Sequence, residues 1–81
     1  MNLRVQLFAA ARQAAGRDVL EVELPPGATI AQLRSRLAAE CPALSSLAGL
    51  VLFAVNAEYA RDTDVIPAGA EVACIPPVSG G

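Results

Sequence analysis

VLEVELPPGATIAQLRSRLAAECP, residues 19–42, contains the change of periodicity that decides the fold. From Leu20 to Leu24 apolar residues alternate with acidic ones, which is the period of two typical of a half-buried strand. From Ile30 onward the apolar residues recur at helical spacing instead. Because Pro25-Pro26-Gly27 separates the two patterns, the stretch predicts a strand, a turn and a helix that packs on one face of a sheet.

The predicted helix has clear start and stop signals. Thr29 is a good N-cap, and Gln32 three residues later fits a capping box. Pro42 ends the helix because proline lacks an N–H and restricts the residue before it. One face of the helix carries the residues predicted to be buried, which are Ile30, Leu33, Leu37, Ala38 and Cys41.

Strand patterns flank this unit on both sides. Residues 3–7 alternate as residues 19–24 do, so the two segments are expected to pair as a hairpin. The Ala-rich residues 9–15 between them predict a short helical turn or a loop, which Gly16 closes. Three more strands are predicted after the helix, at 51–55, 59–61 and 71–75, with turns at 56–58 and 67–69.

The order of these elements indicates an α+β architecture. The first and last strands are expected side by side in the middle of a mixed sheet, with one main helix packed on one face. That is the β-grasp arrangement of ubiquitin, predicted here for residues 1–75. Its core is expected to contain Leu3, Val5, Leu7, Leu20, Val22, Ile30, Leu33, Leu37, Phe53, Val55 and Val72.

Composition excludes several functional classes. The 81 residues are enough for one domain, and the net charge of −2 with no basic block argues against nucleic-acid binding. Two cysteines and no histidine argue against a metal site. No signal peptide and no run of transmembrane length is recognisable, so no membrane contact and a cytoplasmic location are expected.

The last six residues, Pro76-Pro77-Val78-Ser79-Gly80-Gly81, predict an extended tail separate from the domain. The prolines fix φ and favour an extended chain that sets the direction of the arm. Gly80 and Gly81 form a thin tip that can enter a narrow site, since neither has a side chain. The arm is expected to hold a terminal carboxylate out for another protein to modify.

The chain resembles the family of molybdopterin synthase small subunits, which are ubiquitin-like sulfur carriers. The resemblance covers nearly the whole chain. Its most specific part is the tail at its fixed spacing from the Glu71-Val72-Ala73 strand, which separates the sulfur carriers from ubiquitin-like modifiers. Gln13 departs from the family pattern, in which an acidic residue is common. The matching motifs are Leu7-Phe8-Ala9-x-x-Arg12 with Gly16, Val55-Asn56, Gly69-x-Glu71-Val72-Ala73 and the tail 76–81.

The resemblance implies a function in molybdenum cofactor biosynthesis. An E1-like enzyme would use ATP to adenylate Gly81, and a sulfur donor would replace AMP to leave a thiocarboxylate. The tail from Pro76 to Gly80 would then enter the large subunit of a heterotetrameric synthase, where the sulfur builds the molybdopterin dithiolene. The chain would bind no cofactor itself and would not be an enzyme on its own.

Three other functions remain open at this point, and one of them is a plain binding module whose diglycine is incidental. The same tail and fold would serve a sulfur carrier for thiamine thiazole synthesis or for tRNA thiolation. They would also serve a ubiquitin-like protein modifier, although the lack of lysine rules out chains linked through its own side chains.

A partner interface is predicted at the root of the tail. If Leu3, Val5 and Leu7 point toward the helix, Phe8 points to the other face of the sheet. Phe8 and Ile75, on adjacent strands, are expected to form an exposed apolar patch there.

Overall fold

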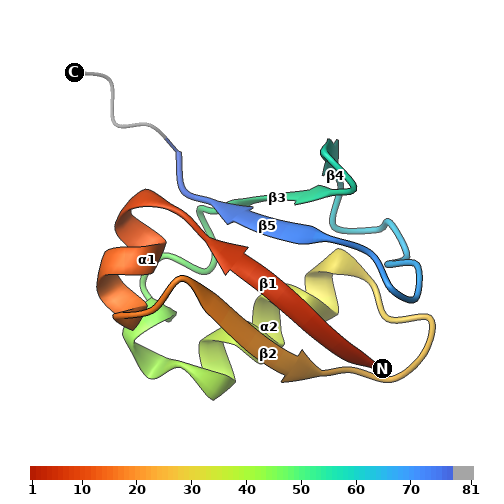
Figure 1. The fold of residues 1–81 in the computed structure, drawn as a ribbon, viewed down its shortest axis with the longest axis horizontal. Coiled ribbons are helices and arrows are strands. Elements are labelled where there is room, and N and C mark those ends of the chain that lie inside the picture. The colour runs from red at the N-terminus through yellow and green to blue at the C-terminus, as the bar shows by residue number, and fades with distance from the viewer. Residues whose placement is uncertain (78–81) are drawn as a thin grey trace.

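The computed structural model describes residues 1–77, which form one five-stranded mixed sheet and its covering helices (Figure 1). The strands lie in the order β2-β1-β5-β3-β4. The main helix, α2, crosses behind the sheet, and the shorter α1 lies at one end of it. In chain order the elements are β1 (Asn2–Leu7), α1 (Ala9–Ala15), β2 (Val19–Glu23), α2 (Ile30–Glu40), the 3₁₀ turn η1 (Pro42–Leu44), β3 (Leu52–Val55), β4 (Glu58–Ala60) and β5 (Val72–Ile75).

The first hairpin and the central strand pair are as predicted. β1 pairs antiparallel with β2, with Leu3 opposite Val22. β1 also pairs in parallel with β5, and β5 pairs antiparallel with β3. The Ala-rich segment forms a true helix, α1, which ends at Gly16 in the left-handed conformation (φ 72°). Glycine suits that C-terminal position because it has no Cβ to clash there.

The capping box predicted for α2 is confirmed. The backbone N–H of Gln32 donates to the Thr29 hydroxyl (3.4 Å), and the Thr29 N–H donates to the Gln32 side chain (2.9 Å). The next free N–H groups, of Ile30 and Ala31, donate to backbone carbonyls of the loop between β4 and β5, at Asp64 and Asp62. The helix start is therefore fixed both by its own sequence and by a distant loop.

One core lies between the sheet and α2. The predicted core residues are buried, except Val55, which is half-buried at the end of β3 beside the short edge strand β4. Ala38 of α2 and Cys41, the residue that caps α2, are half-buried, because only Ile30, Leu33 and Leu37 of the helix are buried against the sheet. The core also contains buried residues outside the predicted set, which are Ala11 of α1, Leu44 of η1, Cys74 of β5 and the loop residues Leu24, Ala28, Val51 and Ile66.

Arg34 is a charged residue of α2 that is partly buried. Its side chain is only 21% exposed. One guanidinium nitrogen donates to the carbonyls of Ala48 and Val51, each at 2.7 Å, and the other reaches the Asp62 carboxylate at 2.8 Å. The guanidinium also lies 5.1 Å from the centre of the Phe53 ring. Arg34 therefore ties α2 to the loop before β3 and to the loop after β4.

The longest helix among residues 1–77, α2, has 11 residues. None of the described helices combines the length and the apolar character that crossing a bilayer would need.

Candidate functional site

The candidate site lies where β5 ends and the tail begins. β5 is held on both sides, with Cys74 opposite Leu7 of β1 and Phe53 of β3. The Phe8 N–H donates to the Cys74 carbonyl (3.2 Å), which extends the ladder by one residue beyond β1. The chain leaves a fixed central strand, as the topology predicts. Figure 1 shows this exit at the end of the sheet that also carries α1.

The described part of the tail is two prolines long. Pro76 is buried and Pro77 is exposed, so the chain becomes exposed to solvent at Pro77. Val78, Ser79, Gly80 and Gly81 lie outside the described residues, and their assignment to a partner's site stays a prediction.

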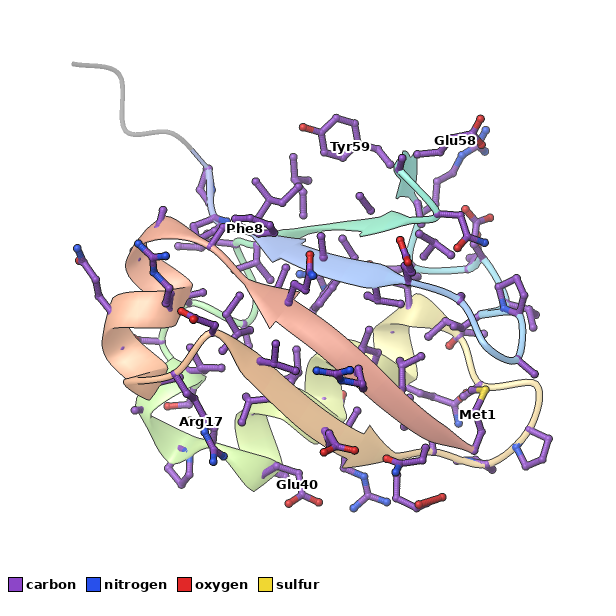
Figure 2. The ribbon with its side chains drawn as sticks, viewed as in Figure 1. Met1, Phe8, Arg17, Glu40, Glu58 and Tyr59 are labelled. Atoms are coloured by element: carbon purple, nitrogen blue, oxygen red, sulfur yellow. The ribbon has the colours of Figure 1, made fainter. Side chains whose placement is uncertain are left out.

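An apolar patch surrounds this exit on the open face of the sheet, opposite α2. Phe8 is 45% exposed and Leu52 is 49% exposed. Ile75 is half-buried and is the register partner of Leu52, so both point to the same face. Figure 2 shows Phe8 over the end of β5. We call Phe8, Leu52 and Ile75 the tail-root patch.

Local backbone geometry holds Phe8 on this face. Phe8 itself is extended (φ −123°, ψ 154°), and the next residue, Ala9, has a left-handed backbone (φ 49°). The abrupt turn starts α1 directly after the strand and leaves the Phe8 ring on the outer face. A left-handed alanine costs about 1–2 kcal/mol, so surrounding contacts must hold it.

Sequence reasoning predicted Phe8 and Ile75 on this surface but missed Leu52. Residues 51–55 are all apolar, which suggested a strand buried on both faces. Within β3, Phe53 is the one buried residue, whereas Leu52 is exposed and Ala54 is half-buried. Because the whole run is apolar, the sequence carried no contrast in polarity that would mark Leu52 as exposed. Tyr59 of β4, opposite Ala54 and 71% exposed, adds an aromatic side chain to the same face.

The thiol nearest the exit is not suited to nucleophilic work. Cys74, two residues before the tail, is buried, and burial raises the pKa of its thiol from 9.0 to about 11, with the Arg34 charge acting in the opposite direction. A thiol with that pKa is almost entirely protonated at neutral pH, and the thiolate is the nucleophilic form. Within residues 1–77, no three His, Cys, Asp or Glu side chains gather as a metal site would need.

A family model and a curated relative both match this chain over nearly all of its length. The ThiS family matches residues 5–81. The chain is 41% identical over 83 aligned residues to a molybdopterin synthase sulfur carrier subunit from Chlamydomonas reinhardtii, and the match covers all of both chains.

Solved structures agree on the fold. SAMP1 of Haloferax volcanii, a small archaeal modifier protein, superposes with a TM-score of 0.86 at 28% identity over all of both chains. A ubiquitin from Caldiarchaeum subterraneum superposes with a TM-score of 0.68 over 100% of this chain and 98% of that one, at 20% identity, which bears on the fold alone. The predicted β-grasp fold is thereby confirmed.

Proposed function

Since the chain belongs to the ThiS family, whose match extends to Gly81, we propose that it carries sulfur on the C-terminal carbonyl of Gly81 for molybdopterin synthesis. Its full-length similarity to molybdopterin synthase sulfur carrier subunits supports a sulfur-carrier role.

The observation that carries the proposal is the position of β5. It is bonded on both sides within the sheet, and an apolar patch surrounds its last residue. A partner that docks on this patch would receive the chain from Pro77 onward at a fixed point and in a fixed direction. Such positioning is what group transfer to a chain terminus requires, because an error of about 1 Å is already costly.

The proposed chemistry starts from a poor electrophile. The Gly81 carboxylate attacks the α-phosphate of ATP on an E1-like enzyme, which releases pyrophosphate and forms an acyl-adenylate. A sulfide-level sulfur then attacks the carbonyl carbon, AMP leaves, and a thiocarboxylate remains. In the large synthase subunit this sulfur attacks an oxygen-bearing carbon of the pterin precursor and the oxygen leaves, since sulfur is a better nucleophile than the carboxylate oxygen at neutral pH. Water then cleaves the acyl C–S bond, which leaves the sulfur on the pterin and returns Gly81 to a carboxylate.

This chain acts in these steps as a co-substrate. The thiol nearest the tail, Cys74, is buried and protonated, which supports Gly81 as the sulfur site in place of a cysteine. Acids, bases and the ATP site would come from the partners. The contribution of this chain is to present its terminus and to dock.

The decisive experiment uses the purified chain, the activating enzyme, ATP and sulfide, and measures intact mass. We expect a sulfur-for-oxygen increase that fragmentation assigns to Gly81. Deleting Gly81, or adding one residue after it, should abolish the increase while the circular dichroism spectrum stays unchanged. The double variant Cys41→Ala, Cys74→Ser is the matched control and should still gain sulfur.

A mass increase that maps to Cys41 or Cys74, or that survives deletion of the diglycine, would overturn the proposal. Co-purification separates the pathways. A pterin-binding large subunit supports molybdopterin synthesis, whereas a thiazole synthase or a tRNA-thiolating enzyme supports one of the other carrier functions.

One observation favours protein modification as a second candidate function. The superposition on SAMP1 covers the whole of both chains with a TM-score of 0.86. In that function the activated Gly81 would be attacked by a lysine amine of another protein. Isopeptide bonds between Gly81 and lysines of other cellular proteins, absent when Gly81 is deleted, would establish it.

A further inference from the structure

A hollow of about 500 Å³ lies on the open face of the sheet, next to the tail-root patch. Register places its floor, because Gln6, Ala73 and Ala54 lie side by side on β1, β5 and β3. The next outward row toward the tail contains Ile75 and Leu52. The hollow therefore continues the tail-root patch across the sheet. We call it the sheet hollow.

Two small side chains create the sheet hollow. Ala54 and Ala73 are register partners on the two strands next to each other, and both are half-buried. On the same face Gln6 and Tyr59 flank this pair with longer, exposed side chains. An alanine pair between longer neighbours leaves a depression that a protruding side chain of a partner can fill.

The rim of the hollow farther from the tail is charged. Arg4 and Glu71 both line the hollow and both are exposed. Glu21 is the register partner of Arg4 across the first hairpin. Arg4, Glu21 and Glu71 have no partner of opposite charge within 4 Å among the described residues, unlike Arg12, Arg34 and Arg36. Glu21 lies beside the hollow on the same face and does not line it; with Glu21 included, the row Glu21, Arg4 and Glu71 has an excess of one negative charge.

We propose that the sheet hollow receives a basic side chain, most simply an arginine, from the protein that docks on the tail-root patch. Its methylene stem would lie on Ala54 and Ala73, and its cationic head would reach the acidic rim at Glu71. Long basic side chains combine an apolar stem with a charged head, and arginine is enriched at interfaces. The inference rests on the proposed function, since it assumes that a partner covers the patch.

The hollow would then select the partner. An apolar side chain could fill the floor but would leave the excess negative charge of the rim unbalanced. An acidic side chain would meet the excess negative charge of the rim. Both would bind less well than a basic side chain.

The test measures affinity for the cognate large synthase subunit by calorimetry at two salt concentrations. Ala73→Leu fills the hollow, and we expect it to weaken binding about tenfold or more, whereas the small control Ala73→Ser should change it by less than about threefold. Glu71→Gln should weaken binding and reduce its salt dependence, whereas Glu40→Gln, on α2 at the opposite face of the sheet (Figure 2), should do neither. Melting curves of each free variant exclude misfolding as the cause.

Phe8→Asp distinguishes a failure of the hollow inference from a failure of docking on the tail-root patch. If Phe8→Asp abolishes binding while Ala73→Leu and Glu71→Gln bind like the parent, the hollow inference is wrong and docking on the patch stands. If Phe8→Asp also binds like the parent, the patch itself is not the docking surface. Sulfur loading of Gly81, measured separately, tests the proposed function without either surface variant.

Discussion

At the scale of single residues, the turn between β3 and β4 is a site where the sequence and the backbone conflict. Val55 and Glu58 are register partners, so Asn56 and Ala57 form a two-residue hairpin turn. Both have positive φ, 51° and 69°. Asparagine adopts that conformation at little cost, whereas alanine adopts it only with steric strain. Glycine is the usual second residue of such a turn.

We therefore expect Ala57→Gly to raise the free energy of unfolding by about 0.5–1 kcal/mol, because it relieves the left-handed strain. Urea unfolding followed by circular dichroism measures the change. Ala39→Gly, an exposed alanine in α2, is the control and should lower stability by about 1 kcal/mol. Destabilisation by both substitutions would contradict the strain argument.

Cys74 gives a second prediction at this scale, which concerns pH. Burial raises the pKa of its thiol from 9.0 to about 11 in the folded chain, while the unfolded thiol keeps the ordinary value. The buried neutral thiol therefore makes its full contribution to the free energy of unfolding below pH 9. That contribution is lost as the pH rises from 9 to about 11. Comparison of unfolding at pH 8 and pH 10.5 should show a larger loss of stability for the parent than for Cys74→Ala. Equal losses would show that Cys74 does not titrate as described.

At the scale of elements, Arg34 links α2 to two loops, and a neighbouring arginine provides the comparison. Arg34 donates to two backbone carbonyls and to Asp62, with its side chain only 21% exposed. Arg36, two residues along, makes one exposed ion pair with Glu40 at 3.7 Å. Partly buried hydrogen bonds from a charged group contribute far more than an exposed pair within one helix.

Arg34→Met should therefore cost about 2–3 kcal/mol, because the carbonyls of Ala48 and Val51 lose their donor. Arg36→Met should cost less than about 0.5 kcal/mol. Chemical denaturation at one pH compares the two variants directly. If both cost the same, Arg34 does not hold the loops together.

At the scale of the whole molecule, the sheet has one face covered by α2 and one face left open at the tail root. Phe8→Asp should weaken binding of the large synthase subunit about tenfold or more, because it places a carboxylate in an apolar contact. Ile75→Asp should act in the same direction. Val65→Asp is the matched control, since Val65 is 59% exposed and lies beside Thr29 at the start of α2, away from the open face. Undiminished binding by both patch variants would refute the docking surface.

Much of the fold could be predicted because the information was local. Alternation in residues 3–7 and 19–24, the Thr29–Gln32 capping box and the stop at Pro42 each act within a few residues, and each is found in the structure. The tail motif is local as well, so the proposed acceptor, Gly81, could be identified from sequence alone. Gly81 itself lies outside the described residues.

What the tertiary structure decided depends on residues far apart in the chain. Arg34 falls on the polar side of α2 by periodicity, and only the return of residues 48–51 and 62 to the helix makes it a partly buried donor. Leu52 belongs to an all-apolar run, and only its pairing with Ile75 fixes it on the open face. The sheet hollow likewise exists only because the pairing of β3 with β5 sets Ala54 beside Ala73. Local sequence determines which elements form, because hydrogen bonds in helices and turns close within a few residues, whereas register between distant strands determines which side chains meet on a surface.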